Sequence, residues 1–213
     1  MRLHTLPFAV VDVETTGGQP GGADRVTELA VVTVQEGHST VAFHSLLDPG
    51  RPIPWHITRL TGIDDAMVRG QPTFADVAGE VAAVLADRVF VAHNARFDFG
   101  FLSAEFGRVA PHPLAGIVAG QLCTVRLARR LLRHLPRRNL DSVAHHYGVT
   151  IDDRHRASGD ALATAAVLQR MLLDLARQGV DTWEELDAWL AAGTSRAKRR
   201  RALPASSDGA DGA

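Results

Sequence analysis

The sequence of 213 residues has little cysteine, almost no net charge and no long apolar run. Its single cysteine, Cys123, excludes an intrachain disulfide and argues against a zinc site built on thiolates. No apolar segment approaches the length that a helix needs to cross a bilayer, so we expect no membrane partner. The segment Met1–Pro7 is too short and too polar for a signal peptide, which leaves the cytoplasm as the predicted location.

The formal net charge is only −1 at pH 7, from 23 basic and 24 acidic residues. The chain as a whole therefore has no attraction for nucleic acid, and any basic surface must be local. Hydrophobic residues make up 46% of the sequence, a share typical of globular proteins. We predict one domain over residues 1–192, followed by a disordered basic and polar tail over residues 193–213.

Strand-like runs come first in the sequence, and helical patterns then alternate with strands. The predicted strands are Phe8–Glu14, Val26–Gln35, Ser39–Leu46, Arg88–Ala92 and Gly116–Thr124. The predicted helices are Thr73–Ala86, Ala95–Arg108, Val125–Leu135, Leu140–Tyr147, Gly159–Arg177 and Trp183–Ala192. This order predicts an α/β domain with a mixed sheet flanked by helices.

The first predicted strand ends with two acids, Asp12 and Glu14, which the period of a strand points to the same side of the sheet. Two adjacent buried carboxylates are costly, because burial and mutual repulsion both disfavour their charged forms. Asp98 stands among phenylalanines, and Asp160 lies in the first turn of a helix for which Ser158 is the expected N-cap. Taken alone, Asp160 could stabilise the helix dipole and Asp98 could lie on an amphipathic surface.

Taken together, the four carboxylates predict a metal site, because strand ends and the helix starts that follow them converge on one crevice of a twisted α/β sheet. Oxygen-rich sites suit Mg²⁺ or Mn²⁺ better than zinc. Four acids match the charge of two divalent cations, and such a pair can clamp the attacking and leaving oxygens of a phosphoryl transfer. His155 lies on the loop that enters the helix of Asp160, and a histidine there suits proton removal from water.

Three motifs carry a family resemblance: DVETTG, HNARFD and HRASGDA, in this order along the chain. From about Phe8 to Leu173 the sequence resembles the histidine-containing DEDD 3′→5′ exonucleases, and within them the epsilon proofreading subunits of bacterial DNA polymerase III. The resemblance implies an RNase H-like fold with a five-stranded mixed sheet whose first three strands are antiparallel. It also implies that Asp12, Glu14 and Asp160 bind the metal ions, that Asp98 completes the site, and that His155 is the general base.

The resemblance further implies a set of residues around the terminal nucleotide: Thr15, Thr16, Leu60, Thr61, His93, Asn94 and Phe97. For the last three, packing at the end of a strand is an almost equal alternative. The expected substrates are single-stranded DNA and primer 3′ ends, and RNA 3′ ends or short oligonucleotides are the alternative. A DNA polymerase is a potential partner, although the polymerase-binding extension and clamp-binding peptide of many replisome relatives are missing, and Cys123 stands where many relatives have an Asp.

The sequence leaves two alternative functions to be considered, and it leaves the role of one basic surface undecided. A non-catalytic binding module of this fold would be expected to have lost a carboxylate or the histidine, and an RNase H-like endonuclease or integrase would not explain His155. Four arginines at helical spacing, Arg126, Arg130, Arg133 and Arg137, predict one stripe on a helix. The stripe could follow phosphates, although a solvated face is the commoner role.

Overall fold

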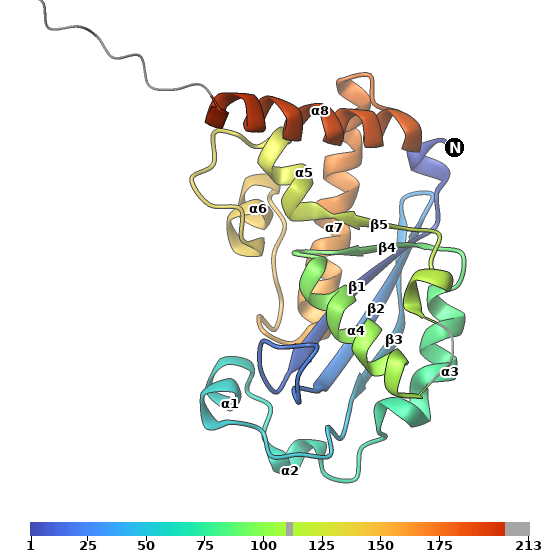
Figure 1. Ribbon diagram of the computed structural model, residues 1–213, viewed down its shortest axis with the longest axis vertical. Helices are drawn as coiled ribbons and strands as arrows, with labels where there is room; N and C mark the ends of the chain where they lie inside the picture. The colour runs from blue at the N-terminus through green and yellow to red at the C-terminus, as the bar shows by residue number, and fades with distance from the viewer. Residues whose placement is uncertain (110–112, 203–213) are drawn as a thin grey trace, which may run out of the picture.

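The computed structural model describes residues 1–109 and 113–202 (Figure 1). Five strands form one sheet in the order β3-β2-β1-β4-β5. They are β1 (Phe8–Thr15), β2 (Val26–Gln35), β3 (His38–Leu46), β4 (Val89–Ala92) and β5 (Gly120–Cys123). β1, β2 and β3 pair antiparallel, whereas β4 is parallel to β1 and β5 is parallel to β4. The predicted mixed sheet with three antiparallel strands first is confirmed.

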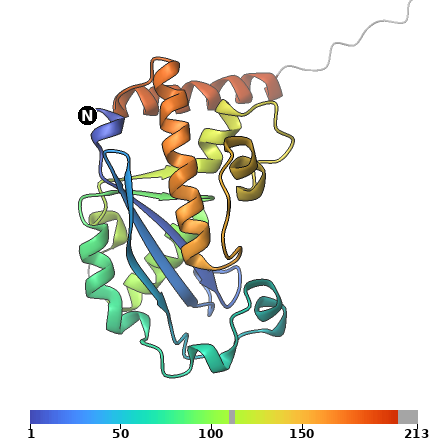
Figure 2. The ribbon, with the colours of Figure 1, turned by 180° about the vertical axis from the view of Figure 1, so that it is seen from behind.

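Helices cover both faces of the sheet, with α7 on one face and α3 and α4 on the other (Figures 1 and 2). The α-helices are α1 (Trp55–Thr61), α2 (Asp65–Val68), α3 (Phe74–Leu85), α4 (Arg96–Val109), α5 (Thr124–Leu131), α6 (Leu140–Tyr147), α7 (Ala157–Arg177) and α8 (Trp183–Ala202). Two 3-10 turns, Leu3–Thr5 and Leu114–Gly116, complete the described elements. Among the described residues, no helix combines the length and apolar character that crossing a membrane requires.

The alternation of side chains along β1 divides the interior into two apolar cores. Phe8 and Val10 pack in the core under α7, and Ala9 and Val11 pack in the core under α3 and α4. The same period continues beyond the apolar part of the strand, so the even-numbered acids, Asp12 and Glu14, lie toward α7. The strand that builds the core thus also presents two carboxylates.

α5 ends at Leu131, four residues earlier than predicted. The side chain of Arg138 donates to the carbonyl oxygens of Leu132 and Arg133, at 3.3 and 2.9 Å, and so satisfies groups that a longer helix would use. Because Arg133 and Arg137 follow the helix, the prediction of one helical arginine stripe is wrong.

The two arginines of the set that lie within α5, Arg126 and Arg130, do not form a free basic surface either. Arg130 stacks its guanidinium on the ring of Trp189 in α8, 3.8 Å from the ring centroid. This cation–π contact joins α5 to α8. Arg126 is exposed on α5, so of the four arginines only Arg126 lies exposed on the helix.

α8 continues to Ala202, ten residues beyond its predicted end at Ala192. Arginine, lysine and alanine dominate residues 196–202 and are good helix formers, which explains why charge alone did not end the helix. The rest of the predicted tail, residues 203–213, lies outside the described residues. The division into a domain and a tail therefore stays a prediction.

Candidate active site

The candidate site lies where β1 and β4 end beside each other. Their parallel pairing stops at Val10 and Val91, so the next part of β1 has no partner on that side. Asp98, in the first turn of α4, fills part of this gap: its buried Oδ1 accepts a hydrogen bond of 3.2 Å from the backbone N–H of Val13. Only three residues separate β4 from α4, and this short connection brings Asp98 back to the end of β1.

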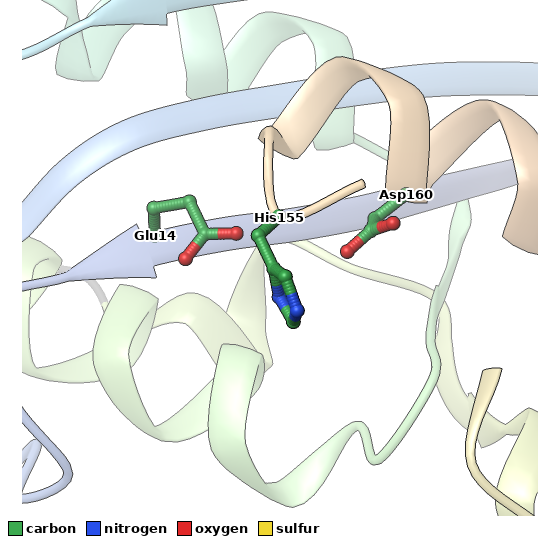
Figure 3. A group of neighbouring side chains, drawn as sticks. All are labelled: Glu14, His155 and Asp160. Carbon is green, nitrogen blue, oxygen red and sulfur yellow. The ribbon is translucent and has the colours of Figure 1, made fainter. Parts of the chain in front are cut away.

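Glu14 and Asp160 meet at the same place from opposite ends of the chain. Glu14 lies at the end of β1, Asp160 in the first turn of α7, and His155 on the loop that precedes α7 (Figure 3). One ligand atom from each of the three side chains lies within 4.8 Å of the other two. The structure therefore brings together Glu14, His155 and Asp160, as the sequence predicted.

The electrostatics place Asp12 and Asp98 in the same cluster. Burial, followed by the charges of Asp98, Asp160 and Glu14, raises the pKa of Asp12 well above its ordinary value. Burial is also the largest cause that raises the pKa of Glu14 to about 8 and that of Asp98 to about 7. Burial raises the pKa of Asp160 as well. Four carboxylates whose pKa values are all raised form a site with an excess of negative charge.

Arg154 is the cation that the sequence analysis missed. Its guanidinium forms a hydrogen bond with Asp160, and its Nε donates to Asp141 of α6 at 2.8 Å. Its charge opposes the raised pKa of Glu14 and Asp160, yet both stay above their ordinary values. Arg154 directly precedes His155 in the sequence, and this adjacency was the available signal.

The donor set fits divalent cations. Oδ1 of Asp160 is buried and has no hydrogen-bond partner among the residues that the structure describes, and such an orphaned oxygen is costly unless a further ligand binds it. Carboxylate oxygens are the donors that Mg²⁺ and Mn²⁺ prefer. Glu14, His155 and Asp160 therefore form the group whose donor atoms lie close enough together to hold a cation, and Asp12 and Asp98 add negative charge beside it.

The loop of residues 152–156 is pressed against the start of α7. His155 has a backbone φ of 64°, in the left-handed region that non-glycine residues rarely adopt. A Cβ atom at Gly159 would collide with the carbonyl oxygen of Asp152 and would lie 2.9 Å from that of Asp153. Only glycine fits at this place, which the sequence analysis did not recognise.

α7 begins two residues earlier than predicted, with Arg156 as its N-cap in place of Ser158. The N-cap side chain makes no capping hydrogen bond. Instead the backbone N–H of Ala157 donates to the carboxylate of Glu28 in β2 at 3.0 Å. The prediction of a serine cap is wrong, because a carboxylate distant in sequence supplies the acceptor that a local cap would provide.

Three threonines predicted at the substrate already use their hydroxyls within the protein. Thr15 donates to the carbonyl oxygen of Gly17 at 2.6 Å, Thr16 accepts from the backbone N–H of Arg25 at 3.0 Å, and Thr61 donates to the carbonyl oxygen of Ile57 at 3.1 Å. All three threonines are buried. Their contacts fold the segments beside the site, and a contact with substrate stays a prediction.

His93 also has its polar atoms engaged. Its Nδ1 lies 2.8 Å from Oγ1 of Thr124, and its Nε2 lies 3.0 Å from the carbonyl oxygen of Arg138. Burial lowers the pKa of His93 to about 4, so the ring stays neutral and joins β4 to the segment before α6. This geometry favours the packing alternative for His93.

The other predicted substrate residues differ in exposure. Asn94 is exposed, with a φ of 80°, and Phe97 packs its ring on Phe101. Leu60 is 54% exposed on α1, and Trp55 on the same helix is 70% exposed, although the sequence analysis did not single it out. A tryptophan directly after a proline-rich connection, outside any apolar pattern, was the available signal.

The sheet order and the flanking helices define an RNase H-like fold, and a cluster of carboxylates with one histidine lies at the end of β1. A family described as exonuclease matches residues 9–168, which is more than half of the chain. The chain therefore belongs to this exonuclease family, and the resemblance that the three motifs indicated is confirmed.

Two relatives illustrate the match. The chain is 39% identical over 213 aligned residues to a Mycobacterium tuberculosis protein whose bifunctional exonuclease/endonuclease activity is itself a prediction; 95% of this chain and 32% of that protein are covered. It is 36% identical over 188 residues to a DNA polymerase III subunit epsilon-like protein of Rhodobacter capsulatus, with coverage of 85% and 26%. The chain thus spans about a third or less of these relatives' own lengths.

Two solved structures show the same fold. Exonuclease X, solved in complex with 5′-overhanging duplex DNA, aligns with a TM-score of 0.60 and 29% identity over 79% of this chain and 91% of the other. The nuclease domain of 3′hExo, a DEDDh family member solved with rAMP, aligns with a TM-score of 0.64 and 19% identity over 82% and 95%. The second likeness supports the fold alone.

Proposed function

We propose that the chain is a 3′→5′ exonuclease that removes nucleoside 5′-monophosphates from DNA 3′ ends with the help of two Mg²⁺ or Mn²⁺ ions. The observation that carries this proposal is the convergence of Asp12, Glu14, Asp98 and Asp160 beside His155. Membership of the exonuclease family supports the reaction class. The polarity and the preference for DNA rest on the motif resemblance and on the DNA that Exonuclease X binds.

Each residue of the cluster has a distinct task in this proposal. Asp12, Glu14 and Asp160 hold the cations, and Asp98 fixes the end of β1 through Val13. Bound divalent cations would supply the positive charge that activates water and stabilises the leaving oxygen. His155 removes the proton of the attacking water, from a loop that α7 and its own left-handed backbone hold beside Glu14.

Exposed side chains on α1 support a path for the substrate strand beside the segment that follows β1. Arg51 donates to the carbonyl oxygen of Ala23 and lies 3.3 Å from Asp24, so the connection that leads into α1 is joined to the segment after β1. Trp55 and Leu60 then offer exposed apolar surface on α1. Bases of a single strand stack on such surfaces with little sequence preference.

A DNA polymerase remains a proposed partner. The name of the Rhodobacter relative, a polymerase III subunit epsilon-like protein, supports it. Gel filtration of the chain with and without a polymerase catalytic subunit would show a shared peak if the two associate.

The direct test uses a 5′-labelled single-stranded DNA oligonucleotide, a matched RNA and a circular single strand. We expect a ladder that shortens from the 3′ end of the DNA with Mg²⁺ or Mn²⁺ and an uncut strand with chelator. Mononucleotide products identified by chromatography would support the proposed bond cleavage.

Other outcomes would replace the proposal with a named alternative. Faster digestion of RNA would indicate an exoribonuclease. Cutting of the circular strand would indicate an endonuclease, and intact substrates with every metal would indicate a non-catalytic binding module.

A further inference from the structure

Glu28, on β2, is a fully buried acid that the proposed chemistry does not use. It stands directly opposite Glu14 in the antiparallel pair of β1 and β2, so both side chains lie on the α7 face. Its carboxylate accepts from Nε of Arg156 at 3.0 Å, from Nη2 of Arg156 at 2.9 Å, and from the backbone N–H of Ala157 at 3.0 Å. Nε2 of His44 lies 2.7 Å away on the other side.

These contacts join Glu28 to the segment between His155 and Asp160. Arg156 directly follows His155, and Ala157 begins the turn that contains Asp160. A bidentate guanidinium–carboxylate pair fixes both distance and orientation more strictly than a single hydrogen bond does. One carboxylate of β2 therefore holds the end of the histidine loop and the start of α7 together.

The loop needs such a restraint. The left-handed backbone of His155 is uncommon for a non-glycine residue and persists only where surrounding contacts determine it. From the other side Arg154 binds Asp160 and Asp141, so His155 lies between two anchored arginines. Loss of one anchor would let the imidazole move relative to Glu14 and Asp160.

We propose that Glu28 is a positioning residue for His155, acting through Arg156 and Ala157. The inference rests on the proposed exonuclease function. A displacement of the general base by about 1 Å can cost on the order of 10²-fold in rate, so we expect Glu28→Gln to lower kcat by about 10- to 100-fold. KM for the oligonucleotide should change by less than about threefold, because Glu28 lies beneath the site and contacts no solvent.

The decisive experiment is a double-mutant cycle with His155→Ala, measured as kcat on single-stranded DNA with saturating Mg²⁺. If Glu28 acts through His155, Glu28→Gln should cost about 10-fold or more in the native background and nothing further in the His155→Ala background. Arg156→Gln should behave in the same way. This second variant leaves the contacts of Glu28 to His44 and Ala157 in place, which guards against a result due to misfolding.

Tyr147→Phe is the matched control, because it removes a hydrogen bond of 2.8 Å to Asp174 that joins α6 to α7 away from the site. It should lower the thermal midpoint while kcat stays unchanged. Equal losses from Glu28→Gln in both backgrounds would overturn the positioning role and indicate a general effect on the fold. An active wild type with a fully active Glu28→Gln would overturn this inference alone, whereas an inactive wild type would overturn the proposed function as well.

Discussion

Two groups of acids in this molecule have opposite environments. Glu28 and Glu105 each receive a forked arginine and a backbone N–H, from Arg156 and Ala157 in one case and from Arg25 and Val26 in the other. The second group consists of Asp12, Glu14, Asp98 and Asp160. Within residues 1–109 and 113–202 it has no comparable set of donors, and Asp160 is its one member with a salt bridge to an arginine.

The two groups differ in how their charge is balanced. Paired arginines and backbone N–H groups stabilise the charged form of the first group, whereas the second group has few such donors among the described residues. Burial favours a raised pKa for Glu28, but the hydrogen bonds of Arg156 and His44 outweigh it and lower the pKa. In the second group burial prevails, and the pKa of Glu14 rises to about 8. The fold thus neutralises its structural carboxylates with paired arginines, whereas in the second group Arg154 only partly offsets the negative charge.

The largest contrast is expected between Asp12→Asn and Glu105→Gln. Asp12→Asn should lower exonuclease activity by at least about 10³-fold, because a cation ligand worth several kcal/mol is lost. It should also raise the thermal midpoint in chelator, since the native state no longer buries a carboxyl group whose ionisation burial and the neighbouring acids oppose. Glu105→Gln should lower the stability by about 3 kcal/mol, from a broken buried ion pair, and leave the enzyme active. Chemical denaturation and the nuclease assay, run on both variants, would contradict the comparison if the two patterns were exchanged.

The two histidines of the motifs give the next contrast. His155→Ala should lower kcat by about 10²–10⁴-fold, the usual loss for a general base, with Mn²⁺ affinity within a few-fold of the native protein. His93→Ala should instead lower the thermal midpoint, because both ring nitrogens join β4 to the α5–α6 region. If His93→Ala had the larger effect on kcat at full folding, the roles would be reversed.

A smaller effect is expected from glycine replacement in two helices. Gly159→Ala should displace the loop of residues 152–156 and lower kcat by about 10-fold, because the new methyl group collides with the Asp152 carbonyl. In Gly79→Ala, in α3, the new methyl group meets no described atom within 4 Å apart from its chain neighbours and the backbone of its own helix. The variant should stabilise the helix by up to about 1 kcal/mol with unchanged activity. Equal behaviour of the two variants in the assay and in thermal unfolding would show that the loop tolerates a side chain at this place.

The smallest effect concerns pH. The pKa of Glu14 is raised from 4.5 to about 8, so the native state keeps a proton that the unfolded chain has lost. This difference makes stability fall with rising pH between about 4.5 and 8, and in the metal-free protein the fall should be measured from about pH 6.5 to 8. The pKa of His93 is lowered from 6.5 to about 4, so His93 makes stability rise with pH, but only below about pH 6.5 and therefore outside this window. Denaturant midpoints in chelator should show the fall, and Glu14→Gln or saturating Mg²⁺ should reduce it.

Much of the fold could be predicted because its signals are local. The order of residues along the chain was enough to predict the alternation in β1, the meander that follows it and the amphipathic helix α3. The carboxylate cluster could also be predicted from the sequence, since buried acids without a packing purpose stand out in an apolar strand.

What the sequence did not predict depends on contacts between distant segments. The end of α5 is set by Arg138, and the start of α7 is set by Glu28, which lies 129 positions before Ala157. The role of Arg154 likewise appears only once α6 and α7 are packed together. Local propensity is a weak guide where a tertiary partner supplies the cap or the counter-charge.

A calorimetric titration with Mn²⁺ at pH 7, in two buffers of different ionisation enthalpy, tests the central claim most directly. If buried, partly protonated carboxylates gather to hold cations, the native protein should bind Mn²⁺ saturably and release protons, and Asp12→Asn and Asp160→Asn should each weaken binding strongly. Absence of saturable binding, or binding that both variants leave unchanged, would contradict the account.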